Sequence, residues 1–417
     1  MSRRTLWLIL AGILFVPTLL AGLVWLNLRL VALNPQDANF IVYWTRTREL
    51  FFHNHSPYTP ETMVQLQSEV YGRPARPGEY AFASTYPLYT TVLFAPFALV
   101  DDYNLARAIW LAVSALVALA CVFLAVHLVA WRPPLWLLVL FAFFTVIWVH
   151  GFLPLLSGNV VLWAFFFLLL SLAAVRAERY EFAGFFLAWV TVQALPFLLV
   201  GVFILLWSIS RRKWVLPVFW LGMVALLTTV GMFFQPGWPV DFLRMALHYS
   251  PYPPPDTLGE TLALWWPGVG RQVGWVMTAL IALVLLVEWW SALRKDFRWF
   301  LWACCLTLVL NQWAGIPTSP EAFVSLSLPL MLVFATWNER NPLGGRVLAI
   351  VTLLILSGGL WPIFWAGRPA YPWPQIPPAL FVPVPLLLFV LLYWVRWWAV
   401  KPRIAYGTTL SHTGVSP

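Results

Sequence analysis

Long apolar runs follow one another along most of the chain, and this succession limits the possible folds more than any other feature. A helix needs about 20 predominantly apolar residues to cross the hydrocarbon core of a bilayer. Hydrophobic residues make up 61% of the 417 residues and charged residues 10%, whereas about a quarter of a soluble domain is charged. The sequence therefore predicts an all-α, polytopic membrane protein whose helices are surrounded by membrane lipids.

The positions of the basic residues predict how the chain crosses the membrane, because Lys and Arg in short loops favour the cytoplasmic side. About twelve membrane segments result, with the run 182–210 counted as two short helices. The expected segments are 5–31, 105–130, 135–152, 160–175, 182–210, 214–234, 273–293, 299–315, 323–337, 347–365 and 380–400. Both termini then lie in the cytoplasm of a multi-pass protein of the cell membrane. The basic residues are scattered over several short loops, so the net charge of +9 gives no support to a nucleic-acid partner.

The run 182–210 is predicted to form a hairpin of two short helices. If it crossed the membrane once, the cluster Arg211-Arg212-Lys213 would lie outside, and every later basic cluster would change side. Pro196 supplies a physical reason for a break near Gln193, because proline has no amide hydrogen and clashes with the preceding turn. Irregular backbone at membrane depth persists only where protein or a cavity covers it, so such a break often marks a ligand site.

The longest polar stretch lies between the first two long apolar runs, and we expect the chemistry there. Asp37 stands at its start, directly after the first predicted span. Tyr43, Arg46, Tyr58 and Tyr86 follow within the same stretch. No other part of the sequence concentrates so many polar groups, so this stretch predicts the functional site.

One integral membrane domain is expected to take up nearly the whole chain. Within it, the apolar piece 88–100 is too short to span and ends at two aspartates, which favours an interfacial or re-entrant helix. The aromatic and proline-rich outside segments are expected to cover an outward-facing cavity. The predicted divisions are the domain 1–403, its first extracytoplasmic loop 32–102 with short interfacial helices, the broken-helix hairpin 182–210, a Pro/Trp-rich extracytoplasmic loop 235–271, a third outside segment 361–378, and a disordered cytoplasmic tail 404–417.

A series of short motifs runs from Asp37 into the second half of the chain. They are Asp37-x-x-Phe40-x-x-Tyr43, Ser56-Pro57-Tyr58-x-Pro60, Tyr86-Pro87 followed by Ala95-Pro96, Gly158-Asn159, and the hairpin that ends in Arg211-Arg212-Lys213-Trp214. Each motif is weak by itself, but their order resembles glycosyltransferase family 87, which belongs to the GT-C superfamily of polyprenyl-phosphate-sugar-dependent membrane enzymes. The resemblance implies an all-helical GT-C fold whose first extracytoplasmic loop carries an acidic base.

The resemblance also implies a reaction. A hexose or pentose, mannose-like, would move from a polyprenyl-phosphate sugar to a hydroxyl of a lipid-linked or envelope glycan on the extracytoplasmic side. Asp37 can take the acceptor proton as the bond forms, and attack opposite the phosphate inverts the anomeric centre. The residues expected to bind donor or acceptor are Tyr43, Arg46, Tyr58, Tyr86, Asn159, Gln193 and Ser319. No cofactor is expected, since the lipid-phosphate sugar is itself the donor substrate.

The chain departs from the family pattern at two places that bear on phosphate binding. Gln193 stands where the family commonly has Lys-Pro, with Pro196 displaced. The His that often follows the Ser-Pro motif at Ser319 is replaced around Ser325. Two residues also have structural readings: Asp37 as a helix N-cap, and Gln193 as a partner of backbone groups freed by the proline.

No metal site is predicted, because His53 and His55 lack a third ligand of clear spacing and the cysteines all lie in apolar runs. Two other function classes stay open. A transporter or flippase would require paired internal repeats and charges deep in the spans. The spans here are almost free of charges and one long loop dominates one side, which favours an enzyme. A non-catalytic member of the family would fit the departures from its motifs. The oligomeric state is likewise left open.

Overall fold

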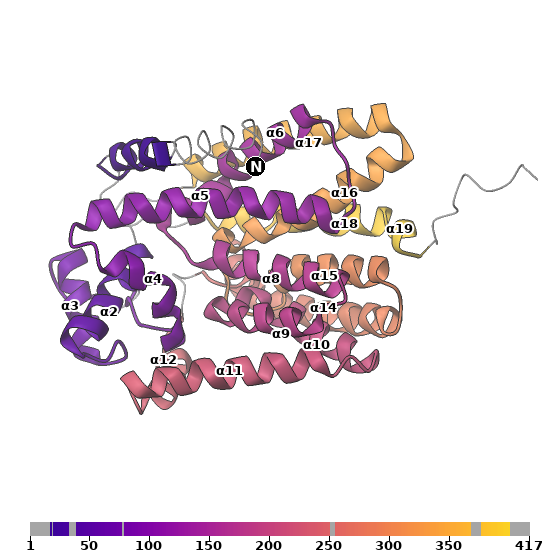
Figure 1. The fold of residues 1–417 in the computed structure, drawn as a ribbon. Coiled ribbons are helices and arrows are strands. Elements are labelled where there is room, and N and C mark those ends of the chain that lie inside the picture. The colour runs from indigo at the N-terminus through magenta and orange to yellow at the C-terminus, as the bar shows by residue number, and fades with distance from the viewer. Residues whose placement is uncertain are drawn as a thin grey trace, which may run out of the picture.

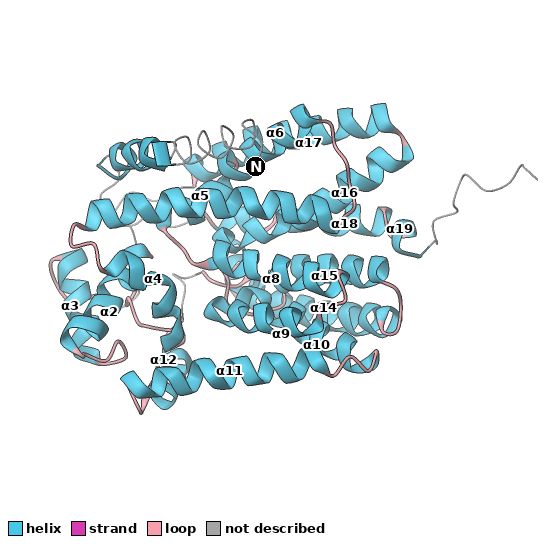
Figure 2. Ribbon diagram, in the orientation of Figure 1, coloured by secondary structure: helices cyan, strands magenta, loops and turns pink. Residues whose placement is uncertain are grey.

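The computed structural model describes residues 17–18, 20–32, 39–76, 79–250, 255–367 and 377–400. Every regular element in these ranges is helical, and they contain no β-strand (Figure 2). An apolar helix, Leu20–Ala32, precedes α2. The other elements are α2 (Phe40–His53), α3 (Pro60–Tyr71), η1 (Leu88–Thr90), α4 (Thr91–Ala98), α5 (Tyr103–Leu128), α6 (Leu135–Ile147), α7 (Val149–Ser157), α8 (Val161–Arg176), α9 (Tyr180–Trp189), η2 (Val190–Gln193), η3 (Leu195–Phe197), α10 (Leu198–Ser210), α11 (Val215–Phe234), α12 (Trp238–His248), α13 (Leu258–Trp265), α14 (Gly270–Ala292), α15 (Phe297–Asn311), η4 (Pro320–Leu326), α16 (Ser327–Arg340), α17 (Pro342–Ala366), η5 (Pro378–Phe381), α18 (Pro383–Trp394) and α19 (Trp397–Val400). The predicted all-α class is confirmed.

Among the described residues, five helices are long and apolar enough to cross a membrane. They are α5, α11, α14, α17 and the continuous stretch Pro320–Arg340 that joins η4 to α16. The bent pair of α6 and α7 makes a sixth if it counts as one span. Length and composition therefore support a membrane protein, while the full number of crossings and their orientation stay predictions.

The helices of the first predicted outside loop gather at one end of the bundle, where α2, α3 and α4 lie beside the start of α5 (Figure 1). Aromatic rings join them: Phe94 of α4 stacks on Tyr43 of α2 at 4.5 Å and on Trp110 of α5 at 4.4 Å between centroids. Trp44 donates from Nε1 to the carbonyl of Phe97 at 3.1 Å. The apolar piece 88–100 is thus a helix packed on its neighbours, and it supports the tyrosine-bearing face of α2.

The segment predicted as one span over 135–152 consists of two helices, and the second continues beyond it to Ser157. α6 ends at Ile147, α7 begins at Val149, and the pair is bent by 55°. Trp148 between them is extended (φ −66°, ψ 153°). A Cβ added to Gly151 would meet the carbonyl oxygen of Thr145 at 1.8 Å, so only glycine permits this close approach. The bend directs α7 toward η4.

The segment 182–210 contains the break near Pro196. The α-helical pattern is interrupted from Val190 to Phe197 by two short 3₁₀ turns, η2 and η3. Asn311 of α15 binds both sides of η3, because its Nδ2 donates to the carbonyl of Leu195 and its Oδ1 accepts from the amide of Leu199, each at 3.1 Å. The backbone groups beside the proline therefore have Asn311 as their partner.

The two ends of this segment lie together, as in a hairpin. The ammonium of Lys213 lies 4.8 Å from the centre of the Tyr180 ring, so the start of α9 meets the start of α11. Gly184 of α9 approaches the backbone of Leu216 and Trp220 so closely that a Cβ would meet them at 2.4 and 2.8 Å. The side of the membrane on which these ends lie is a separate prediction.

Most described residues of the Pro/Trp-rich stretch 235–271 are helical, since α12, α13 and the first two residues of α14 lie within it. Gln235 attaches this stretch to the end of α2 by donating from Nε2 to the carbonyl of Asn54 at 3.4 Å. The third predicted outside segment, 361–378, is described at residues 361–367 and 377–378, and the tail 404–417 lies outside the described residues.

Candidate functional site

A hollow lies where the helices of the first predicted outside loop meet the rest of the bundle. The space between atoms there is about 380 Å³, and this volume includes open solvent. Its lining residues are Asn39, Val42, Tyr43, Tyr80, Ala83, Thr85, Tyr86, Asn159 and Gln193. They come from the start of α2, the stretch 80–86, the turn between α7 and α8, and the hairpin break at η2. Four of the candidate binding residues, namely Tyr43, Tyr86, Asn159 and Gln193, are thus brought to one pocket.

Three tyrosines, Tyr43, Tyr80 and Tyr86, contribute aromatic rings to the lining. Tyr43 occupies the buried face of α2, and its ring centroid is 4.7 Å from that of Tyr86. Tyr58, another candidate, lies behind the wall and donates its hydroxyl to the carbonyl of Tyr86 at 2.9 Å. Burial raises the pKa of Tyr86 to about 12, and it also raises the pKa of Tyr80. Both phenols stay protonated at neutral pH and present hydroxyl groups instead of charge.

Asn159 is held in a defined orientation at the turn between α7 and α8. Gly158 closes α7 in the left-handed region (φ 70°), which suits glycine. The Oδ1 of Asn159 then accepts from the amide of Val161 at 2.9 Å, at the start of α8. Its Nδ2 is consequently directed to the other side, where it donates to Oε2 of Glu321 at 2.5 Å. The motif Gly158-Asn159 therefore presents an amide whose direction is set by the backbone.

Glu321 is a functional candidate that the sequence analysis did not identify. It belongs to η4, its side chain is 7% exposed, and Asn39 also donates to its Oε2, at 3.3 Å. His150 of α7 holds the preceding residue, with its Nδ1 2.7 Å from the carbonyl oxygen of Pro320. The signal in the sequence was an acid directly after a Ser-Pro motif at the head of an apolar run, where a charge is rare and often functional.

Two other candidates do not line the pocket. Arg46 is 1% exposed, and its Nη2 donates to the carbonyl of Phe82 at 3.3 Å, where the backbone has an unusual positive φ of 53°. Burial lowers the pKa of this guanidinium, which still stays protonated as arginine does in proteins. Ser319 is buried at the start of η4, and its hydroxyl has no hydrogen bond within the described part of the chain. Arg46 therefore supports the stretch that carries the pocket wall.

The predicted base, Asp37, lies outside the described residues. Asn39, two residues further along the chain, lines the pocket.

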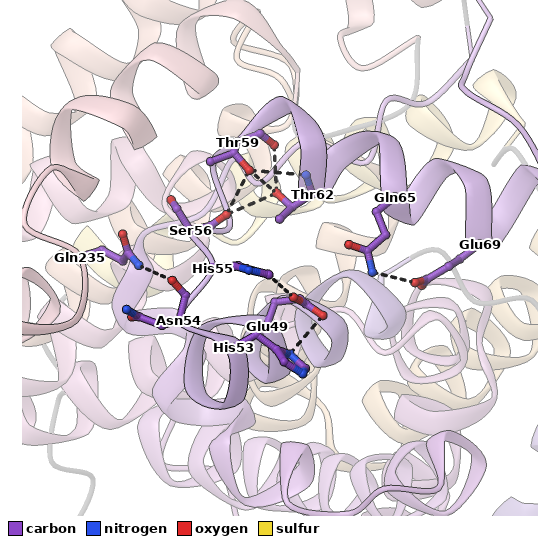
Figure 3. A network of polar contacts seen from close by, with 10 residues as sticks. All are labelled: Glu49, His53, Asn54, His55, Ser56, Thr59, Thr62, Gln65, Glu69 and Gln235. Atoms are coloured by element: carbon purple, nitrogen blue, oxygen red, sulfur yellow. Dashed lines mark hydrogen bonds and ion pairs between the residues drawn. The ribbon is translucent and has the colours of Figure 1, made fainter.

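His53 and His55 both contact the carboxylate of Glu49 at the end of α2 (Figure 3). Nδ1 of His55 lies 2.8 Å from Glu49, and Nδ1 of His53 lies 3.5 Å from its other oxygen. Thr59 caps the next helix, α3, by accepting from the amide of Thr62 at 3.4 Å. These contacts stabilise the connection between α2 and α3. The described ranges contain no group of side chains suited to hold a metal ion.

Comparisons of the chain with protein-family models, with curated proteins and with solved structures found no match.

Proposed function

We propose that the protein is an integral membrane glycosyltransferase of GT-C type with about twelve membrane segments. It moves a mannose-like hexose or pentose from a polyprenyl-phosphate donor to a hydroxyl of a lipid-linked or envelope glycan on the extracytoplasmic side. The supporting observation is the pocket, because residues from motifs far apart in the sequence, Tyr43, Tyr86, Asn159 and Gln193, line one hollow. Motifs that follow one another along the sequence therefore contribute residues to the same pocket.

In this mechanism the pocket binds the glycosyl group through hydroxyl and amide groups. Asn159, Gln193 and the tyrosines supply donors and acceptors at fixed positions, which suits a ligand with several hydroxyl groups. Asp37 takes the proton of the acceptor hydroxyl as that oxygen attacks the anomeric carbon. The bond to the lipid phosphate breaks on the opposite face, so the configuration inverts and the lipid phosphate leaves.

The test is the variant Asp37→Asn in purified protein reconstituted in lipid. Asparagine keeps the size and most hydrogen bonds but cannot take a proton, so we expect the transfer rate to fall on the order of 100-fold or more. A helix cap would be nearly unaffected, because Asn caps about as well as Asp. Transfer by Asp37→Asn at the parent rate would remove Asp37 from the mechanism. If the parent transfers no sugar from any polyprenyl-phosphate donor, the proposed activity itself fails.

A further inference from the structure

A buried carboxylate stands directly behind the pocket. Oε2 of Glu321 accepts hydrogen bonds from two lining side chains, Asn39 at 3.3 Å and Asn159 at 2.5 Å. The two asparagines are 120 residues apart in the sequence, so the carboxylate joins two walls of the hollow. η4 is fixed beside them, since His150 contacts the carbonyl of Pro320. Glu321 is therefore part of the site although it does not form its surface.

The hydrogen bonds around Glu321 suit its ionised form. The amide of Val161 fixes which end of the Asn159 side chain faces Glu321, because it needs the Oδ1 as its acceptor. The nitrogen that remains can only donate, so Glu321 must accept. Burial opposes a negative charge, whereas donors from two amides on one oxygen favour it. A proton on Oε1 would leave both bonds to Oε2 in place but weaken them, because the oxygen of an ionised carboxylate is the stronger acceptor.

Among the described residues, the pocket lining carries no charged side chain, since tyrosine, asparagine, glutamine, threonine and small apolar residues line it. Arg46 is a cation whose charge acts on one lining residue, Tyr86. Arg46 donates to the carbonyl of Phe82, which is outside the lining, whereas Glu321 binds two lining side chains directly. Because Coulomb interactions weaken with distance, the carboxylate dominates at the wall formed by Asn39 and Asn159.

We propose that Glu321 is ionised in the folded protein and gives the pocket a negative potential, so that the pocket accepts an uncharged or cationic group and repels phosphate. The charge thus selects among ligands without touching them. For the sugar donor this reading rests on the proposed function: the glycosyl group enters the hollow, and the phosphate stays outside it. The electrostatic statement itself holds for any ligand.

A single cysteine in the pocket measures this potential without any substrate. Thr85 lines the hollow and is not one of the residues to which Glu321 is hydrogen-bonded above, and the native cysteines Cys121, Cys304 and Cys305 are buried. The Thr85→Cys protein is labelled with two methanethiosulfonates of similar size, one with a trimethylammonium group and one with a sulfonate. Their rate ratio is divided by the ratio measured for free 2-mercaptoethanol. We expect the cationic reagent to be favoured on the order of 3- to 10-fold, and less at high salt.

The variant Glu321→Gln removes the charge and keeps an acceptor of the same shape, so it should lower the normalised ratio toward one. The matched control is Glu288→Gln. Glu288 is also a buried carboxylate, bound to Tyr393 at 3.2 Å and Arg396 at 3.0 Å between α14 and the C-terminal helices. Its neutralisation should leave the ratio unchanged. Glu321→Asp keeps the charge and should also keep the preference.

The proposal is overturned if the anionic reagent reacts as fast as the cationic one in Thr85→Cys, since Arg46 would then set the potential. It is also overturned if Glu321→Gln keeps the full preference. If Glu321→Gln does not fold, the labelling ratio of Thr85→Cys alone and its ratio in combination with Glu321→Asp still test the proposal. A correct labelling pattern in a protein that transfers no sugar would uphold this inference and reject the proposed function.

Discussion

Single buried polar side chains in this protein bind the backbone where helices are interrupted. Asn311 binds both sides of η3 beside Pro196, and its side chain is fully buried. Arg46 binds the carbonyl of Phe82, where φ is positive. A carbonyl or amide without a partner in such surroundings costs more than the hydrogen bond itself contributes. These residues are therefore expected to matter for stability more than their small number suggests.

Replacing Asn311 with leucine tests whether its hydrogen bonds to the backbone stabilise the hairpin 182–210. The side chain keeps nearly the same size, but the carbonyl of Leu195 and the amide of Leu199 lose their partner. We expect a loss of about 2–4 kcal/mol in unfolding free energy, measured as a lower Tm of the purified protein in detergent. Thr336→Val is the control, because that buried hydroxyl only binds the carbonyl of Leu332 in its own helix. Equal Tm values for the two variants would contradict the role of Asn311.

Asp256 predicts a pH dependence of stability. Burial, together with the neighbouring Glu260, raises the pKa of Asp256 from 3.8 to about 6, although the hydroxyl of Ser250 donates to it. The folded state then binds a proton more tightly than the unfolded state, so this stabilisation is present below about pH 4 and is lost as the pH rises through about 6. Asp256→Asn should remove this pH-dependent contribution to the free energy of unfolding, which is on the order of 2 kcal/mol.

The measurement compares Tm at about pH 4.5 and about pH 7.5 for the parent and for Asp256→Asn. The parent should gain more on acidification than the variant does. An identical pH profile for both proteins would show that Asp256 does not titrate in this range.

At the scale of elements, the sequence predicted an interruption of a helix where a single residue determines the backbone conformation. Pro196 predicted an interruption, and η2 and η3 are found there, because proline acts locally. The bend at Trp148 had no such signal, since it follows from the approach that Gly151 allows to Thr145. That approach depends on packing between helices, which apolar periodicity does not encode.

The hairpin also makes an orientation prediction. Arg179 and Lys213 flank the segment 182–210, and Tyr180 contacts Lys213. Single cysteines at Arg179 and Lys213 should therefore react with a membrane-impermeant thiol reagent from the same side, the cytoplasmic one. Right-side-out and inside-out vesicles distinguish the two sides. Labelling of the two positions from opposite sides would mean that the segment crosses the membrane once.

At the scale of the molecule, the site was predictable in part. The concentration of aromatic and polar residues in the first loop predicted Tyr43 and Tyr86 as site residues, and both line the pocket. The motif Gly158-Asn159 predicted Asn159, which also lines it. Glu321 was missed because the next span was expected to begin at residue 323, which left this acid in a loop with no role. Which acid meets which amide is a long-range contact, and no spacing along the chain specifies it.

The outer surface of the bundle gives a further reason to treat the long helices as spans. Large apolar side chains on α11, α14 and α17 are exposed, and only a small share of each helix is buried inside the molecule. Such faces would be a liability in water, since contiguous exposed apolar area promotes aggregation. In a bilayer the same side chains contact acyl chains and are stable there.

Introducing one charge on such a face distinguishes lipid from water, because the two surroundings predict opposite signs. Leu283 lies near the middle of α14 and is 59% exposed. Leu283→Lys should reduce insertion and yield, since a lysine at the centre of a spanning helix costs about 2.5–3.5 kcal/mol. Val64→Lys, on the 40% exposed Val64 of α3 outside the long helices, is the matched control and should be tolerated. The readout is the amount of folded protein recovered from membranes, with Tm as a second measurement. If Leu283→Lys is recovered and melts like the parent, that face of α14 meets water, and α14 is not a membrane span.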